Sequence, residues 1–144
     1  MSSFKLDSRV HLQLQLLRWL DECSYSEAIW ASLNANTTGA FGTNVATIAI
    51  TLSPIAKAKL TDVATIHSST LSDTLNAYIS GRYYSLEPYI QGTVTQYEEL
   101  RNHLGNLLDS ELLGLSPKVL SSLNLKLKYL VDRLDTYNNL VALL

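Results

Sequence analysis

The residues best suited to chemistry in this 144-residue chain are three histidines and a single cysteine. His11, His67 and His103 stand outside the H-E-x-x-H and E-x-x-H patterns, which place two metal ligands on one helix face. Glu99 precedes His103 by four residues, so these two side chains can share a helix face. A metal site in a helical bundle needs several inward carboxylates. We therefore expect no metal site and no cofactor.

Cys23 lacks the setting of a catalytic thiol. A nucleophilic thiolate needs a partner histidine and a positively charged environment. The nearest histidine in the sequence, His11, lies about three helical turns away. The serines also lack a motif, since no G-x-S-x-G sequence occurs. We interpret the chain as non-enzymatic and Cys23 as a small buried hydrophobe.

Segment 34–44 is rich in Asn, Thr and Gly, which is the composition of a loop. Gly39 to Asn44 could form an anion-binding nest if a helix followed. The segment lacks the lysine of a P-loop and the third glycine of a dinucleotide site. We therefore expect a plain loop, and the most mobile part of the chain.

Composition narrows the function classes further. Charged residues make up 17% of the chain and apolar residues 47%, whereas about 25% charged residues is usual. Such a chain either buries itself unusually well or keeps part of its surface for another protein. The net charge of −2 gives no electrostatic footprint for nucleic acid.

The hydrophobic segments give an expectation about location. The N-terminus has no apolar core of a signal peptide. The most hydrophobic window, 45–58, is interrupted by Ser53-Pro54 and is shorter than the roughly 20 apolar residues of a membrane span. We expect a cytoplasmic, or at least intracellular, protein without a membrane span.

Caps and apolar periodicity predict where the helices begin and end. Asp7 or Ser8 can cap a first helix to about Glu22, and the capping-box spacing of Ser24 to Glu27 starts a short second helix to about Leu33. The later boundaries that we expect are a helical segment over 45–52 capped by Asn44, a long helix over 54–80 ended by Gly81, a helix from Ser85 to Gly114, and a last helix from Ser116-Pro117 to Leu144.

The last helix has the most regular apolar pattern. Its seam residues follow alternating spacings of three and four: Leu120, Leu123, Leu127, Leu130, Leu134, Tyr137, Val141 and Leu144. Such a seam packs against another helix at a shallow angle. The predicted fold class is therefore all-α, with residues 1–144 forming a single domain. Its architecture would be an antiparallel helical bundle of four main helices plus one short helix.

The end of this last helix is the predicted partner interface. Its final two turns are apolar on more than one face, whereas a bundle covers one face only. Lys126 and Arg133 flank the seam one heptad apart, at positions that steer partner choice in coiled coils. The predicted interface residues are Tyr137, Leu140, Val141, Leu143, Leu144, Lys126 and Arg133.

Two function classes remain. The first is a non-enzymatic protein–protein interaction or assembly subunit, which binds a protein partner or further copies of itself through the C-terminal helix. The second is a helical subunit of a nucleoprotein assembly, such as a viral coat or a small subunit of an RNA-guided complex, with basic residues on the nucleic-acid backbone. The low charge and the apolar seam favour the first class. Lys118, Lys126 and Arg133, without interleaved aromatic residues, give the second class little support.

Overall fold

The computed structural model describes residues 2–110 and 114–144. This described part is mostly helical, with helices over 73% of its residues, and it also holds a small two-stranded sheet. The all-α prediction is thus roughly right but missed the sheet. The elements are β1 (Ser2–Asp7), α1 (Ser8–Asp21), α2 (Tyr25–Asn34), β2 (Val45–Ile50), α3 (Pro54–Ile66), α4 (Leu71–Leu108) and α5 (Pro117–Leu143).

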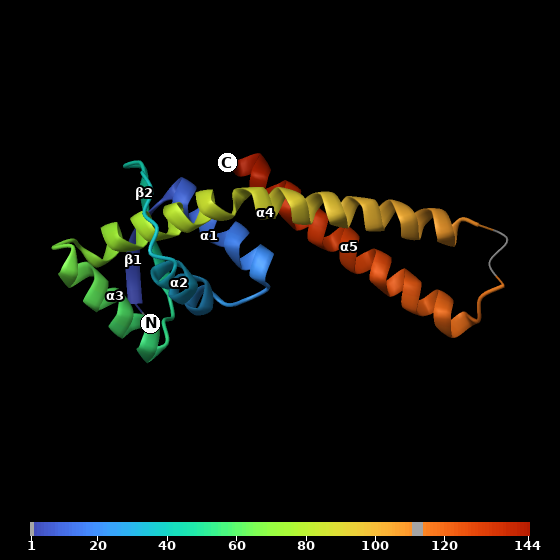
Figure 1. The fold of residues 1–144 in the computed structure, drawn as a ribbon, viewed down its shortest axis with the longest axis horizontal. Coiled ribbons are helices and arrows are strands. Elements are labelled where there is room, and N and C mark those ends of the chain that lie inside the picture. Colours follow the sequence, from blue (N-terminus) through green and yellow to red (C-terminus); the bar gives the residue numbers. More distant parts are fainter. Residues whose placement is uncertain (1, 111–113) are drawn as a thin grey trace. The chain divides into compact units, whose positions relative to one another are not determined.

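The chain divides into two compact units, whose elements Figure 1 labels in sequence colours. The first unit comprises residues 1–87 and 143–144, so it holds both strands, α1 to α3 and the beginning of α4. The second unit comprises residues 88–142, which form the rest of α4 and nearly all of α5. The single domain and the antiparallel bundle stay predictions.

Four helices begin where the sequence predicts. Side-chain oxygens accept hydrogen bonds from first-turn amides, and so cap α1, α2, α3 and α5 in turn: Asp7, Ser24, Ser53 and Ser116. Pro54 and Pro117 each occupy the first helical position, where no N–H is needed. Each of these starts depends on residues only a few positions apart, and for that reason local sequence reveals them.

The helix predicted over 45–52 is wrong, because residues 45–50 form strand β2. β2 pairs antiparallel with β1, from the Ser2–Ile50 pair to the Asp7–Val45 pair. The β-branched residues of β2 favour a pleated strand. Their partner strand, β1, lies at the N-terminal end of the chain, so the periodicity of neighbouring residues does not reveal the pairing.

The outer edge of β1 is covered by side chains of α4. Asn76 donates from Nδ2 to the Lys5 carbonyl at 3.0 Å and accepts from the Asp7 N–H at 2.8 Å. Ser72 Oγ accepts from the Lys5 N–H at 3.0 Å. Asn76 is only 1% exposed, so its amide replaces a neighbouring strand and satisfies main-chain groups that water cannot reach.

The long helix predicted over 54–80 is interrupted. α3 ends at Ile66 and α4 begins at Leu71. Between them, Ser68 adopts a φ of 50°, in the left-handed region that continues no helix. Thr70 then accepts a hydrogen bond from the N–H of Asp73 at 3.0 Å, which gives α4 its own cap.

Gly81 does not end a helix, contrary to the prediction, and no new helix begins at Ser85. α4 is continuous from Leu71 to Leu108, so it also ends before Gly114. A Cβ at Gly81 would overlap the main chain of residues 37–38. Gly81 is therefore needed for the close approach of the loop between α2 and β2.

That loop has neither helix nor strand over residues 37–44, as predicted, but it is held by hydrogen bonds on two sides. The Gly39 N–H donates to the Ala77 carbonyl at 2.9 Å, and Ser80 Oγ donates to the Ala40 carbonyl at 2.8 Å. At its end, the Asn44 carbonyl accepts from the Ser8 N–H at 2.8 Å. Asn44 therefore caps no helix, and the anion nest has no helix behind it because a strand follows.

Both strands and the first four helices share one core in the first unit. Its buried residues are Phe4, Leu6, Val10, Leu14, Leu17, Ala28, Ile29, Leu33, Ile50, Leu60, Val63, Leu75, Tyr78 and Ile79. α1 is buried on more than one side, since Leu16 and Trp19 are buried as well.

Replacing Asn76 with Leu should lower the free energy of unfolding by about 2–4 kcal/mol. The substitution removes three hydrogen bonds, and it leaves the buried Asp7 N–H and the partly buried Lys5 carbonyl without their partner. Urea denaturation measures the loss. Asn124→Leu is the matched control, because the exposed Asn124 amide bonds only the Leu120 carbonyl one turn back. Equal effects of the two substitutions would contradict the role given to Asn76.

Replacement by alanine should change the free energy of unfolding differently for a proline inside a helix and for a proline at the start of a helix. Pro88 lies inside α4, where it removes one helical hydrogen bond, so Pro88→Ala should raise the free energy of unfolding by about 1–3 kcal/mol. Pro54→Ala should change it by less than about 1 kcal/mol, because position N1 suits proline. Thermal melts followed by circular dichroism compare the variants, and a destabilising Pro88→Ala would contradict the interpretation.

Candidate functional site

The predicted interface residues of α5 differ widely in exposure. Tyr137 is 7% exposed and Leu140 is half-buried. Val141, Leu143 and Leu144 are exposed, Leu143 to 71%. The structure therefore assigns Tyr137 to the interior and leaves the last apolar side chains accessible.

Two side-chain contacts join α4 and α5 within the second unit. Gln91 Nε2 donates to Tyr137 Oη at 3.0 Å. The guanidinium carbon of Arg133 lies 5.6 Å from the centre of the Tyr97 ring, within the range of a cation–π contact. Arg133, predicted to steer a partner, thus contacts its own chain. Buried apolar residues lie beside these contacts on both helices: Ile90, Val94, Leu130 and Leu134.

Over residues 95–110 and 114–129 of the second unit, no side chain is fully buried, and the leucines that face the other helix are at most half-buried. Leucines are frequent in this stretch, yet several apolar side chains are between 39% and 67% exposed: Leu100, Leu107, Val119, Leu125 and Tyr129. Below, "the open helix pair" means these two stretches of α4 and α5. Within the described part of this unit, no third helix covers these apolar side chains.

The charges of the open helix pair are divided between its two helices. On α4 they are Glu98, Glu99 and Arg101, and Asp109 follows the end of this helix, so this stretch is acidic overall. On α5 they are Lys118, Lys126 and Lys128, with no acidic residue before Asp132. Lys126 Nζ lies 5.3 Å from the centre of the Tyr129 ring. The predicted cation Lys126 is therefore exposed beside an exposed aromatic ring.

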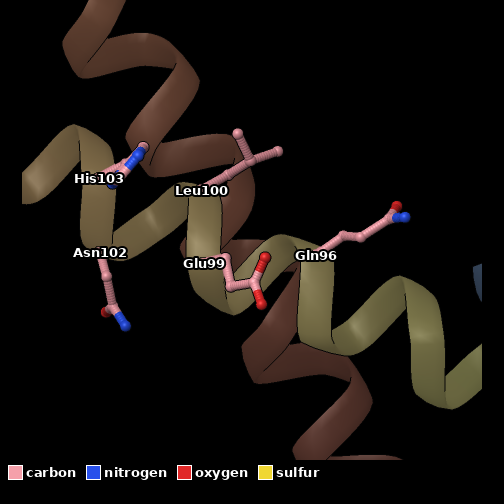
Figure 2. A pocket seen from close by; sticks show the side chains of 5 residues that line it. All are labelled: Gln96, Glu99, Leu100, Asn102 and His103. Atoms are coloured by element: carbon pink, nitrogen blue, oxygen red, sulfur yellow. The ribbon is translucent and has the colours of Figure 1, made fainter.

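A hollow of about 560 Å³ lies along α4 in the same region. Its lining residues are Gln96, Glu99, Leu100, Asn102 and His103. Figure 2 shows Leu100 and His103 extending to one side of α4 and Asn102 to the other. Two amides, a carboxylate, an imidazole and a leucine can hold a polar main chain and an apolar side chain together. Such a mixture suits a peptide or a helix more than a metal.

Sequence reasoning missed this hollow and the exposed leucines of the helix pair. The signal was present, since Leu100 and Leu107 stand one heptad apart on α4 and Leu125 precedes Tyr129 by four residues on α5. A single sequence does not show which apolar residues of a helix its own chain covers.

The chemistry-bearing residues are not brought together. Glu99 and His103 line the same hollow, but no group of three or more His, Cys, Asp or Glu residues in the described part could hold a metal ion.

Among the described helices, none is long and apolar enough to cross a bilayer. His11 stacks on Tyr25 with ring centres 6.4 Å apart, and burial lowers the pKa of His11.

Cys23 is half-buried, in the turn between α1 and α2. Burial raises the pKa of its thiol, and the carboxylates of Asp21 and Glu27 raise it further, while Arg82 and Arg18 act in the opposite direction. Arg82 is itself bound to Asp21, at 2.6 Å. A thiol with a raised pKa is mostly protonated at neutral pH, which is the opposite of what a nucleophile needs.

Comparison of the chain with protein-family models, with curated proteins and with solved structures finds no match.

Cys23 should react with a disulfide reagent at neutral pH more slowly than glutathione does. Its raised pKa leaves less thiolate than an ordinary thiol has. Release of the chromophore from the reagent gives the rate. Glu27→Gln keeps an oxygen that can accept from Ser24 but removes a charge, so it should speed the reaction. A wild-type rate above that of glutathione would contradict the interpretation.

Proposed function

We propose that this chain is a non-enzymatic assembly subunit whose open helix pair packs against helices of a protein partner. The observation that carries the proposal is the lack of any buried side chain over the described residues 95–110 and 114–129. A helix becomes stable in water mainly by burying an apolar face against other elements. Here two long helices present apolar residues that no element of their own unit covers.

The energetic argument is one of scale. Burying a leucine completely is favourable by about 1.5–3 kcal/mol relative to leaving it in water. Leu125 is 67% exposed, and Leu100 and Leu107 are each close to half exposed. Covering several such residues together yields more than any single surface contact does. The antiparallel helical bundle predicted from the seam would then form between this helix pair and the partner's helices.

Charge supports a helical protein partner over nucleic acid. The acidic stretch of α4 lies in the same unit as the basic stretch of α5, so a polyanion would meet repulsion from Glu98 and Glu99. A partner with complementary charges would gain orientation from both stretches. The nucleoprotein alternative depends on Lys118, Lys126 and Arg133, of which Lys118 and Lys126 are exposed and Arg133 is half-buried beside Tyr97.

Size-exclusion chromatography with light scattering tests the proposal, because it measures the mass of the assembly that the intact chain forms. Leu100→Gln and Leu125→Gln should each lower the mass of the assembly while the helical circular dichroism signal stays the same. Ile66→Gln is the matched control, because Ile66 is also a largely exposed apolar residue on a helix, outside the open helix pair.

Two results would contradict the proposal. If the two leucine variants and Ile66→Gln assemble equally well, the open helix pair is not the interface. If the mass rises only when an oligonucleotide is added, and Lys126→Gln abolishes that rise, the nucleoprotein alternative is correct.

A further inference from the structure

The two-stranded sheet of the first unit has one covered edge and one bare edge. The covered edge is that of β1, where Asn76 and Ser72 of α4 bond the main chain of Lys5 and Asp7. The bare edge is that of β2, whose six residues Val45–Ile50 include no charge and no proline. Natural proteins usually blunt such an edge with lysine, proline or a bulge.

The pairing register shows which groups of β2 face outward. Lys5 and Asp7 direct their main-chain groups toward α4, hence away from β2. Residues directly opposite each other in an antiparallel ladder share this orientation, so Thr47 and Val45, their partners, face away from β1. Ala49, two residues along, does the same.

These outward groups have almost no partners in the described part of the chain. Only the Val45 N–H is bonded, to the Thr43 carbonyl at 2.9 Å. Val45, Thr47 and Ala49 are all exposed. The edge therefore offers a short ladder of free N–H and C=O groups with no charged side chain in its own strand.

We propose that β2 pairs antiparallel with β2 of a second copy of this chain, across a two-fold axis at Thr47. The Thr47 N–H would donate to the Thr47 carbonyl of the second copy, and the Ala49 N–H to its Val45 carbonyl. Thr47 then faces Thr47, a favourable cross-strand pair, and no like charges meet. This interface is separate from the open helix pair.

The covered edge explains why a single second copy is the occupant. A sheet with two bare edges would continue to add strands and form a filament. Here α4 blocks the edge of β1 in each copy, so pairing through β2 uses up the bare edges at once. The result is a closed, four-stranded sheet with two-fold symmetry.

A charge exchange at residue 47 tests this pairing. Thr47→Glu places like charges opposite each other across the axis, while Lys5 on its own chain lies beside it and keeps β1 and β2 paired. The opposite charge is introduced as Thr47→Lys together with Lys5→Ser, so that two lysines do not face each other within one chain. All variants carry Leu100→Gln and Leu125→Gln, which removes the helix-pair interface.

In that background each charged variant alone should be a monomer by light scattering, and an equimolar mixture should recover the dimer mass. Ser3→Lys, on the same face of β1 but away from the axis, should leave the dimer intact. A parent that is already monomeric, charged variants that stay dimeric, or a mixture that stays monomeric would each overturn the proposal.

A second variant guards against misfolding of the charged chains. Thr47→Pro removes only an outward N–H, because the Thr47 N–H does not bond β1, and edge strands tolerate such a proline. It should give a monomer whose circular dichroism spectrum matches that of the parent. A Thr47→Pro chain that is folded and still dimeric would overturn the proposal.

Discussion

The side-chain amide of Asn76 is the contact on which the first unit depends. It joins β1 to α4 across 71 residues of sequence and lies almost fully buried. By bonding the Asp7 N–H it places the Asp7 carboxylate to cap α1, through the amides of Arg9 and Val10. One buried amide thus fixes the edge of the sheet, the start of a helix and the position of α4 together.

The loop between α2 and β2 follows from the same arrangement. With β1 held against α4, the chain must return over α4 to bring β2 alongside β1. Gly81 permits that close approach, and the carbonyls of Ala77 and Ala40 bond with groups on the facing segment. The composition of the loop predicts mobility. In the structure, hydrogen bonds hold the loop at Gly39, Ala40 and Asn44.

Local chemistry explains which parts of the fold could be predicted from the sequence. The caps at Asp7, Ser24, Ser53 and Ser116 were predictable because each involves neighbours in sequence. The pairing of β1 with β2 was not, since it is non-local and its strands are short enough to be mistaken for helix. Gly81 was misjudged for a related reason, because a glycine needed for close approach looks like a glycine needed for a turn.

The candidate site could be predicted only in part. The regular seam of α5 predicted a helix, which the structure has, and its residues Leu134 and Tyr137 are buried. The extent of burial along α5 depends on the neighbouring helix, and neither Tyr129 nor the described residues of α5 before it are fully buried. The exposed leucines could not be predicted from a single apolar stripe, because the sequence does not show that α4 is one continuous helix from Leu71 to Leu108.

The first unit has its own buried core, and we propose that the open helix pair packs against a partner. Amide hydrogen exchange, measured at low and high protein concentration, tests it most directly. We expect the main-chain amides of α1 and of the α4 segment around Leu75 to exchange slowly at both protein concentrations. Amides of 98–108 and 118–129 should exchange fast in dilute protein and slow down as assembly proceeds. Equal, strong protection of those two segments at every concentration, in a chain of monomer mass, would contradict it.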